Sequence, residues 1–222
     1  MGRLLVVSGK KGSGKDTLVD NVGRVVADMG FTTLKLPVAL PLKERAAALF
    51  DAYRAQKLQQ ALCADELFRD SEAFRAEATE RIEDIFDRGL PVDAFGHAHP
   101  DIRLFLQWFG SEVGRSFDEN YWAQQSAEKI RGKLGTVGLI GVPDARFPSE
   151  IYSLQEFNPL IIRLDIDKEL QRQRILERDG YLPSEEAFAH ASESGLDDFE
   201  FEHRFDAALP ESVIVQEVMR LF

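Results

Sequence analysis

The chain carries the stretch Gly9-Lys10-Lys11-Gly12-Ser13-Gly14-Lys15-Asp16-Thr17 directly after the apolar run Leu4-Leu5-Val6-Val7. The spacing of Gly9, Gly14 and Lys15 fits the first seven positions of the phosphate-binding loop pattern. Glycines in such a loop let successive backbone N–H groups turn towards an anion, and the following helix adds the positive end of its dipole. The sequence therefore predicts a strand, a triphosphate-binding loop and a helix at the start of the chain.

One position departs from the pattern, because Asp16 stands where Ser or Thr is usual and the hydroxyl follows at Thr17. A glycine-rich turn can join any strand to any helix. Here an apolar strand precedes the loop and an amphipathic helix follows it, which favours a nucleotide site. We expect Lys15 to reach the β- and γ-phosphates of ATP. The candidate ATP-binding residues are Gly9, Lys11, Gly12, Ser13, Gly14, Lys15, Asp16 and Thr17.

The length and composition of the chain exclude several classes of protein. With 222 residues the chain is long enough for one α/β domain with insertions, and a net charge of −11 argues against general affinity for a nucleic-acid polymer. No apolar run approaches the ~18 residues that a membrane span needs. The start of the chain shows no secretory pattern, and the single cysteine, Cys63, excludes an internal disulfide. We expect a cytoplasmic protein without membrane partners, and we leave open both a monomer and a homodimer.

Apolar runs alternate with helical patterns along the chain. Strands are predicted over residues 1–8, 31–36, 136–142, 160–164 and 205–209, with helices over 14–29, 101–115, 119–132, 168–178 and 211–221 and a short one from Pro148. Residues 41–88 have a helix-forming composition, and residues 180–203 form a polar, acidic flap. This order predicts a three-layer α/β/α fold of the P-loop NTPase class, with a central parallel five-stranded sheet and a helical insert.

Charged side chains follow the third predicted strand. Asp144 comes directly after it, placed to hold Mg²⁺ or to orient an acceptor, and Arg146 could pair with a phosphate. The alternative is that Asp144 caps the helix that begins at Pro148. Further along, Arg172, Arg174 and Arg178 lead into the flap, where guanidinium groups could stabilise a transferring phosphoryl group. They cannot all share one helical face, so we expect one or two to be functional.

A second polar set lies on the predicted helix over 101–115. Arg103 and Gln107 are spaced i, i+4 and share a face, a suitable pairing for a nucleotide phosphate and base. The alternative is an ordinary amphipathic helix with a solvated arginine. Trp122 is more often a core residue than a stacking platform, unless its helix borders the cleft. The four histidines lack zinc spacing, which argues against His190 as a metal ligand.

Several segments together resemble the bacteriophage-type deoxynucleoside monophosphate kinases, which are relatives of adenylate and dephospho-CoA kinases. The shared segments are the loop from Ser8 to Thr17, Arg103-x-x-x-Gln107-x-x-Gly110, Phe117-Asp118-x-x-Tyr121-Trp122, Val142-Pro143-Asp144-x-Arg146 and His190-x-x-Glu193-x-Gly195. The resemblance implies a core of residues 1–36 and 133–222, a helical monophosphate-binding region at 37–132 and a lid at about 172–203. The hydroxyl at Thr17 is similar to the Lys-Gly-Thr ending of adenylate kinases.

The resemblance implies transfer of the γ-phosphoryl group of ATP to a (deoxy)nucleoside 5′-monophosphate, with Mg²⁺ as cofactor. The candidate catalytic residues are Lys15, Asp144, Arg146, Arg172 and Arg174, and Thr17 is the candidate metal ligand. The candidate acceptor-binding residues are Lys43, Arg103, Gln107, Trp122, Asp144, Arg146 and Glu193. Two alternatives remain: a kinase acting on phosphomevalonate or dephospho-CoA, and a nucleotide-binding NTPase without a small acceptor. Asp16 and the lack of a guanine-specificity segment disfavour a switch NTPase.

Overall fold

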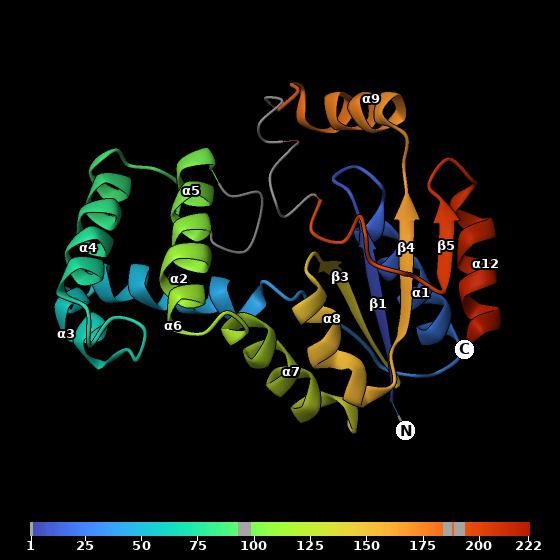
Figure 1. The fold of residues 1–222 in the computed structure, drawn as a ribbon, viewed down its shortest axis with the longest axis horizontal. Helices are drawn as coiled ribbons and strands as arrows, with labels where there is room; N and C mark the ends of the chain where they lie inside the picture. Colours follow the sequence, from blue (N-terminus) through green and yellow to red (C-terminus); the bar gives the residue numbers. More distant parts are fainter. Residues whose placement is uncertain (1, 93–98, 184–187, 189–193) are drawn as a thin grey trace. The chain divides into compact units, whose positions relative to one another are not determined.

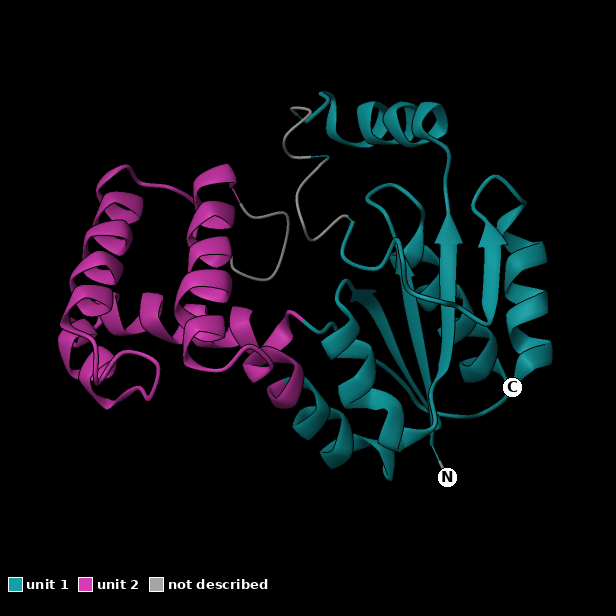
Figure 2. Cartoon of the chain, in the orientation of Figure 1, with its two compact units in different colours: residues 1–38, 126–222 teal, residues 39–125 magenta. Residues whose placement is uncertain are grey.

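The computed structural model describes all residues except 1, 93–98, 184–187 and 189–193. It divides into two compact units, one of Met1–Val38 with Ser126–Phe222 (unit 1) and one of Ala39–Gln125 (unit 2). Figure 2 shows the two units in different colours. Within the described residues, no helix combines the length and the apolar character required to cross a bilayer.

Unit 1 is built on a parallel sheet of five strands in the order β2-β3-β1-β4-β5 (Figure 1). The strands are β1 (Arg3–Gly9), β2 (Thr33–Lys35), β3 (Leu139–Ala145), β4 (Leu160–Asp165) and β5 (His203–Asp206). Its described helices are α1 (Lys15–Asp28), the later part of α7 (Tyr121–Leu134), α8 (Pro148–Leu154), α9 (Lys168–Asp179) and α12 (Glu211–Leu221), with a 3₁₀ turn over Gln155–Phe157. The predicted P-loop NTPase fold with a five-stranded parallel sheet is confirmed.

The central strands are apolar on both faces because both faces of the sheet are covered. Leu5 and Val7 of β1 pack in one cluster with residues of α1 and α12. Leu4 and Val6 are equally buried, and strand alternation points them to the opposite face, where α8 lies in Figure 1. The carboxyl ends of all five strands therefore meet at one edge, which is where ligands bind in open α/β folds.

Two predicted strands are displaced along the chain. The strand predicted at 136–142 is observed at Leu139–Ala145, because Leu4, Leu5 and Val6 of β1 pair in register with residues 140–142. Asp144 consequently lies inside β3 and not after it. The strand predicted at 205–209 is observed at His203–Asp206, since pairing with β4 ends at Asp165 and the Ala207 N–H closes onto the Asp165 carbonyl.

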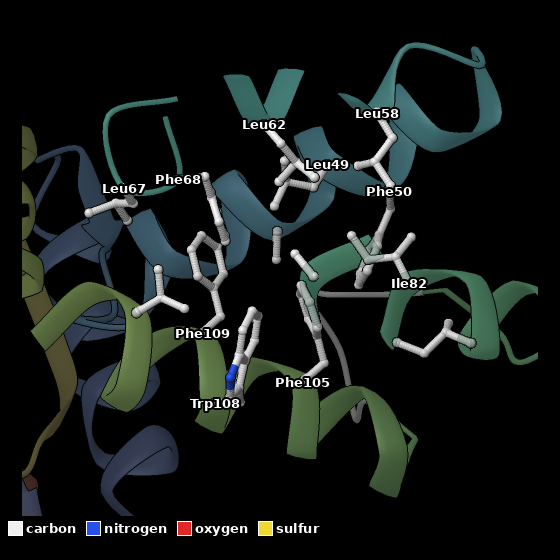
Figure 3. Packing of buried hydrophobic residues seen from close by; sticks show 14 of the residues in the cluster. Leu49, Phe50, Leu58, Leu62, Leu67, Phe68, Ile82, Phe105, Trp108 and Phe109 are labelled. Atoms are coloured by element: carbon white, nitrogen blue, oxygen red, sulfur yellow. The ribbon is translucent and has the colours of Figure 1, made fainter. Parts of the chain in front are cut away.

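Unit 2 is helical and has a core of its own, rich in aromatic side chains (Figure 3). Its elements are α2 (Leu40–Arg54), α3 (Leu58–Ala64), α4 (Glu72–Asp87), α5 (Pro100–Trp108), a π-helical turn (Phe109–Gly114), α6 (Arg115–Phe117) and the first part of α7 (Tyr121–Leu134). Phe105 and Phe109 are fully buried, with ring centroids 5.9 Å apart. The helices α2, α4 and α5 each bury apolar residues in this core.

The single helix predicted over residues 101–115 is interrupted by the π-helical turn. The reason is Trp122, whose buried indole N–H donates to the Gly110 carbonyl at 2.9 Å. Gly114 leaves room for the same ring, because a Cβ there would lie 2.1 Å from the indole nitrogen. A π-helical turn leaves a backbone carbonyl that a regular α-helix would have used in its own i to i+4 hydrogen bonds, and a side chain can donate to that carbonyl.

Candidate active site

The glycine-rich loop connects β1 to α1 and contributes the first residue of that helix. Gly14 precedes α1 with a φ of 90°, and Gly12 has a φ of 84°. Residues with a Cβ rarely adopt this left-handed region, so both positions require glycine. A Cβ on Gly12 would also meet Ile175 of α9 at 3.3 Å. A glycine-rich loop that leads into a helix N-terminus is suited to bind an anion.

Lys15 and Ser13 place polar groups inside this loop. The Lys15 side chain is 8% exposed, and its Nζ donates to the Lys10 carbonyl at 2.9 Å, so the ammonium folds back over the loop. The Ser13 hydroxyl is buried and has no hydrogen-bond partner among the residues that the structure describes. A buried polar atom without a partner costs roughly 1–3 kcal/mol, which an entering oxygen-rich anion would recover. The residues present therefore fit the phosphates of a nucleotide.

Asp16 is exposed, and its carboxylate forms an ion pair with Lys35 at the end of β2, at 2.9 Å. Lys35 also contacts Asp20 at 3.1 Å. Partial burial tends to lower the pKa of Lys35, but its hydrogen bonds with Asp16 and Asp20 raise it above its ordinary value. The negative charge that interrupts the usual loop pattern is thus balanced by a cation on the neighbouring strand. Thr17 is exposed in the first turn of α1, and its role as a metal ligand stays a prediction.

Helix α9 packs against the loop, a contact that sequence patterns did not indicate. The Gln171 amide donates to the Lys11 carbonyl at 2.9 Å, and Gln171 is 6% exposed. Lys11 forms an ion pair with Asp179 at 3.0 Å, and Lys10 forms one with Asp197 at 3.0 Å. Hydrogen bonds from Arg178, and then from Lys11, hold the pKa of the Asp179 carboxyl well below its ordinary value. In the sequence, the one sign of this contact is that Gln171 is a polar residue at a position of the helix that becomes buried.

The arginines predicted on α9 point to different partners. Arg174 donates to the Ala207 carbonyl at 2.8 Å and so ties α9 to the turn after β5. Arg172 is exposed, with its guanidinium 5.4 Å from the centre of the Phe188 ring. Arg178 forms a bidentate pair with Asp179 at 2.7 and 2.9 Å. The structure does not bring Arg172 and Arg174 together at one point, and their catalytic roles stay predictions.

Asp144 and Arg146 lie at the carboxyl end of β3, next to β1. The Asp144 carboxylate accepts the Val38 N–H at 2.6 Å. At the start of α8 the Glu150 carboxylate accepts the N–H groups of Arg146 at 2.6 Å and Phe147 at 3.1 Å. The first turn of α8 is therefore capped from its third helical position, and the catalytic role of Asp144 stays a prediction.

The candidate acceptor residues of unit 2 divide into exposed and buried ones. Arg103 and Gln107 are both exposed on one face of α5, while Lys43 on α2 is half-buried. Trp122 is 9% exposed and belongs to the aromatic core, which is the alternative stated for it above. Its indole is held by Gly110 and presents little surface to a ligand. Glu193 and His190 lie outside the described residues.

Unit 2 also contains a charged network that the sequence analysis did not single out. Arg45 pairs with Asp65 at 2.8 Å and Glu66 at 3.1 Å and hydrogen-bonds the Tyr121 hydroxyl, which itself donates to Glu66 at 2.6 Å. Burial, together with the hydrogen bond to Glu66, raises the pKa of Tyr121 to about 12. Two carboxylates neutralise Arg45, so the network holds helices together and offers no anion site.

Two cavities differ in their relation to these residues. One of about 530 Å³ in unit 2 is lined by Tyr53, Phe86 and neighbouring polar side chains and contains none of the predicted site residues. The other, of about 460 Å³, borders the loop at the carboxyl ends of β4 and β5. Its lining is Lys10, Arg163, Leu164, Asp165, Ile166, Asp167, Asp197, Arg204 and Asp206. Within the described residues no group of three or more His, Cys, Asp or Glu is arranged to hold a metal ion.

Comparison with known proteins finds similarity at the level of structure. No family model and no curated protein matches the chain. A sugar kinase from a Janibacter species is 18% identical over 99% of this chain and 94% of its own, with a TM-score of 0.48. A gluconokinase from Sinorhizobium meliloti is 16% identical (99% and 93% covered, TM-score 0.44), and shikimate kinase from Aquifex aeolicus is 13% identical (98% and 94% covered, TM-score 0.45). Identities this low say nothing about what this chain acts on.

Proposed function

We propose that the protein is an ATP-dependent phosphotransferase of the P-loop kinase class with a small-molecule acceptor. The observation that carries the proposal is the interior of the loop. Lys15 is buried and folded over it, and the Ser13 hydroxyl is buried without a partner among the described residues. A preorganised ammonium, a hydroxyl and inward backbone donors suit the β- and γ-phosphates, whose charge spreads during phosphoryl transfer.

The sheet edge supplies the other proposed roles. Lys15 and the loop N–H groups would bind the phosphates of ATP, and Thr17 with Asp144 would hold Mg²⁺, directly or through water. When bound, Mg²⁺ neutralises phosphate charge and orients the β- and γ-phosphates. Asp144 lies near the end of β3 and Arg146 directly follows that strand, beside β1, which leads into the loop. There they would orient the acceptor against the γ-phosphate.

The nucleoside end of ATP would occupy the cavity over β4 and β5. That cavity borders Lys10 and lies on the side of β1 away from β3. Its aspartates, among them Asp167 and Asp206, are suitable acceptors for ribose hydroxyl groups. Asp144 on β3 would then face the acceptor, and the two substrates would meet at the loop.

The acceptor is the finer part of the proposal. A (deoxy)nucleoside monophosphate is the first candidate, because Arg103 and Gln107 share an exposed face of α5 and supply a cation for phosphate and an amide for base edges. Phosphomevalonate and dephospho-CoA are the alternatives within the class. An NTPase without a small acceptor is the alternative outside it.

An acceptor screen separates these possibilities. Formation of ADP from ATP and Mg²⁺ is measured alone and with each dNMP and NMP, phosphomevalonate, dephospho-CoA, shikimate and gluconate. A kinase forms ADP faster with its acceptor, in equal amount with phosphorylated product. Lys15→Ala should abolish transfer, because its ammonium balances charge that grows in the transition state. Lys133→Ala, at an exposed position of α7, is the matched control and should keep full activity.

The outcomes are distinct. ADP formation that no acceptor changes would favour the NTPase. If another compound accelerates ADP formation, the protein is still a small-molecule kinase, but its acceptor is that compound and not a nucleoside monophosphate. Turnover of Lys15→Ala within a few-fold of the unaltered protein would remove the loop from the active site and end the proposal.

A further inference from the structure

Strand β4 carries a buried charged residue, Arg163, between the apolar residues Ile162 and Leu164 and before its last residue, Asp165. Arg163 lies in register with Ser8 of β1 on one side and Arg204 of β5 on the other. Its side chain is only 7% exposed. Removing a guanidinium from water costs several kcal/mol unless each donor finds a partner, so the contacts of Arg163 reveal what it does.

Arg163 makes two hydrogen bonds, and its Nε also lies 3.7 Å from the carboxylate of Asp165. Nη1 donates to the Ser8 hydroxyl at 3.0 Å, and Nη2 donates to the Asp197 carboxylate at 2.8 Å. The guanidinium also lies 5.6 Å from the centre of the Phe201 ring. These contacts fix the orientation of the guanidinium plane. The ammonium group of a lysine has no such plane and could not make the same set of contacts.

Two of these partners, Ser8 and Asp197, connect Arg163 to the phosphate-binding loop. Ser8 directly precedes Gly9, where the loop begins. Asp197 uses its second carboxylate oxygen to hold Nζ of Lys10, a residue of the loop, at 3.0 Å. Arg163 is therefore linked to the loop indirectly at two points, through the Ser8 hydroxyl next to the first loop residue and through the Asp197 carboxylate that Lys10 shares.

We propose that Arg163 is a positioning residue for the phosphate-binding loop, acting through Ser8 and Asp197 without touching the phosphates. The inference deepens the proposed function and rests on it only in requiring that the loop bind phosphate. A loop held in its binding conformation loses less entropy when the anion arrives, so its affinity for phosphates is higher.

The test measures binding of tripolyphosphate by calorimetry, which needs neither an acceptor nor turnover. Arg163→Met keeps side-chain length and removes the fork, and should weaken binding about tenfold, as expected for loss of charged hydrogen bonds. Ser8→Ala removes one contact without changing charge, and should weaken binding by about two- to fivefold. The double variant should bind like Arg163→Met, because both changes break the same connection. Arg163→Lys should recover part of the loss.

A control variant separates this role from a general effect of losing an arginine. Arg131 forms ion pairs with Glu128 and Glu156 at an exposed surface, and Arg131→Met should bind tripolyphosphate as the unaltered protein does. Circular dichroism reports folding of each variant. If Arg163→Met does not fold, Ser8→Ala and Arg163→Lys decide, because each keeps the buried site filled.

Three results would overturn the role of Arg163. If all folded variants bind tripolyphosphate with the affinity of the unaltered protein, Arg163 does not position the loop. Full recovery in Arg163→Lys with no effect of Ser8→Ala would reduce it to a plain charge effect. Equal losses in Arg131→Met would make the effect unspecific. If the unaltered protein binds no tripolyphosphate, the proposed function itself fails, and this role fails with it.

Discussion

Lys11 of the phosphate-binding loop and Asp179 at the end of α9 form an ion pair at 3.0 Å, and Arg178 binds the same carboxylate through two nitrogens. The pair attaches the helix after β4 to the loop after β1. Because the folded protein holds the pKa of Asp179 below its ordinary value of 3.8, the ionised carboxylate stabilises the fold.

The sign of the pH dependence follows from that direction. The contribution of Asp179 is fully present above pH 3.8 and is lost as the pH falls from there through the lower pKa of the folded protein. Asp179→Asn should lower the free energy of unfolding at pH 7 by about 1 kcal/mol and flatten its decline in acid. Chemical denaturation between neutral pH and pH 2 measures both. Asp70→Asn, at an exposed pair with Arg69, should change neither. Identical acid profiles for Asp179→Asn and the unaltered protein would contradict the role of the pair.

Two substitutions of Asp144 distinguish the effect of its negative charge from the effect of its hydrogen bond with Val38. Asparagine keeps an oxygen that can accept the Val38 N–H, whereas alanine does not. Asp144→Asn should therefore keep the stability of the fold and lower kcat by about a hundredfold, the scale of losing an electrostatic contact in the transition state. Asp144→Ala should lose the same activity and also about 1 kcal/mol of stability. Full turnover in Asp144→Asn would leave the residue a purely structural acceptor.

Arg103 is exposed, so its removal tests binding without disturbing a core. Arg103→Ala should raise the KM of a nucleoside monophosphate by the equivalent of roughly 1.5–3 kcal/mol, as for a lost phosphate contact, and leave the KM of ATP unchanged. Steady-state kinetics with each substrate varied gives both values. Arg69→Ala, another exposed arginine of unit 2, is the control and should alter neither constant. Equal changes for the two substrates would move Arg103 out of the acceptor site.

Gly114 and Gly132 offer a matched pair for the packing of Trp122. A Cβ on Gly114 would lie 2.1 Å from the indole nitrogen, whereas a Cβ on Gly132 in α7 meets nothing within 4 Å. Gly114→Ala should lower the free energy of unfolding by about 1–3 kcal/mol through overpacking. Gly132→Ala should raise it by about 0.5–1 kcal/mol, because alanine loses less backbone entropy in a helix. Denaturant titration compares them, and equal stability of the two variants would show that the indole is not tightly enclosed.

The sequence by itself determined the class of fold and the place of the loop. Regular spacing of glycines after an apolar strand is a local property, and so is the alternation of apolar runs with helical patterns. The alternation predicted five parallel strands, and the glycine spacing predicted a phosphate-binding loop that includes Lys15. The sequence analysis did not single out Arg163, whose contacts depend on the pairing of β4 with β1.

Tertiary structure alone decided which distant residues meet. Register with β1 moved Asp144 into β3 and gave the capping of α8 to Glu150. Packing of α9 on the loop brought Gln171 and Asp179 to Lys11, across about 160 residues of chain. The indole of Trp122 opened the π-helical turn at Gly110. Such contacts join residues far apart in the chain, and local propensity carries no record of them because their free energy comes from burial and hydrogen bonding after the chain has folded.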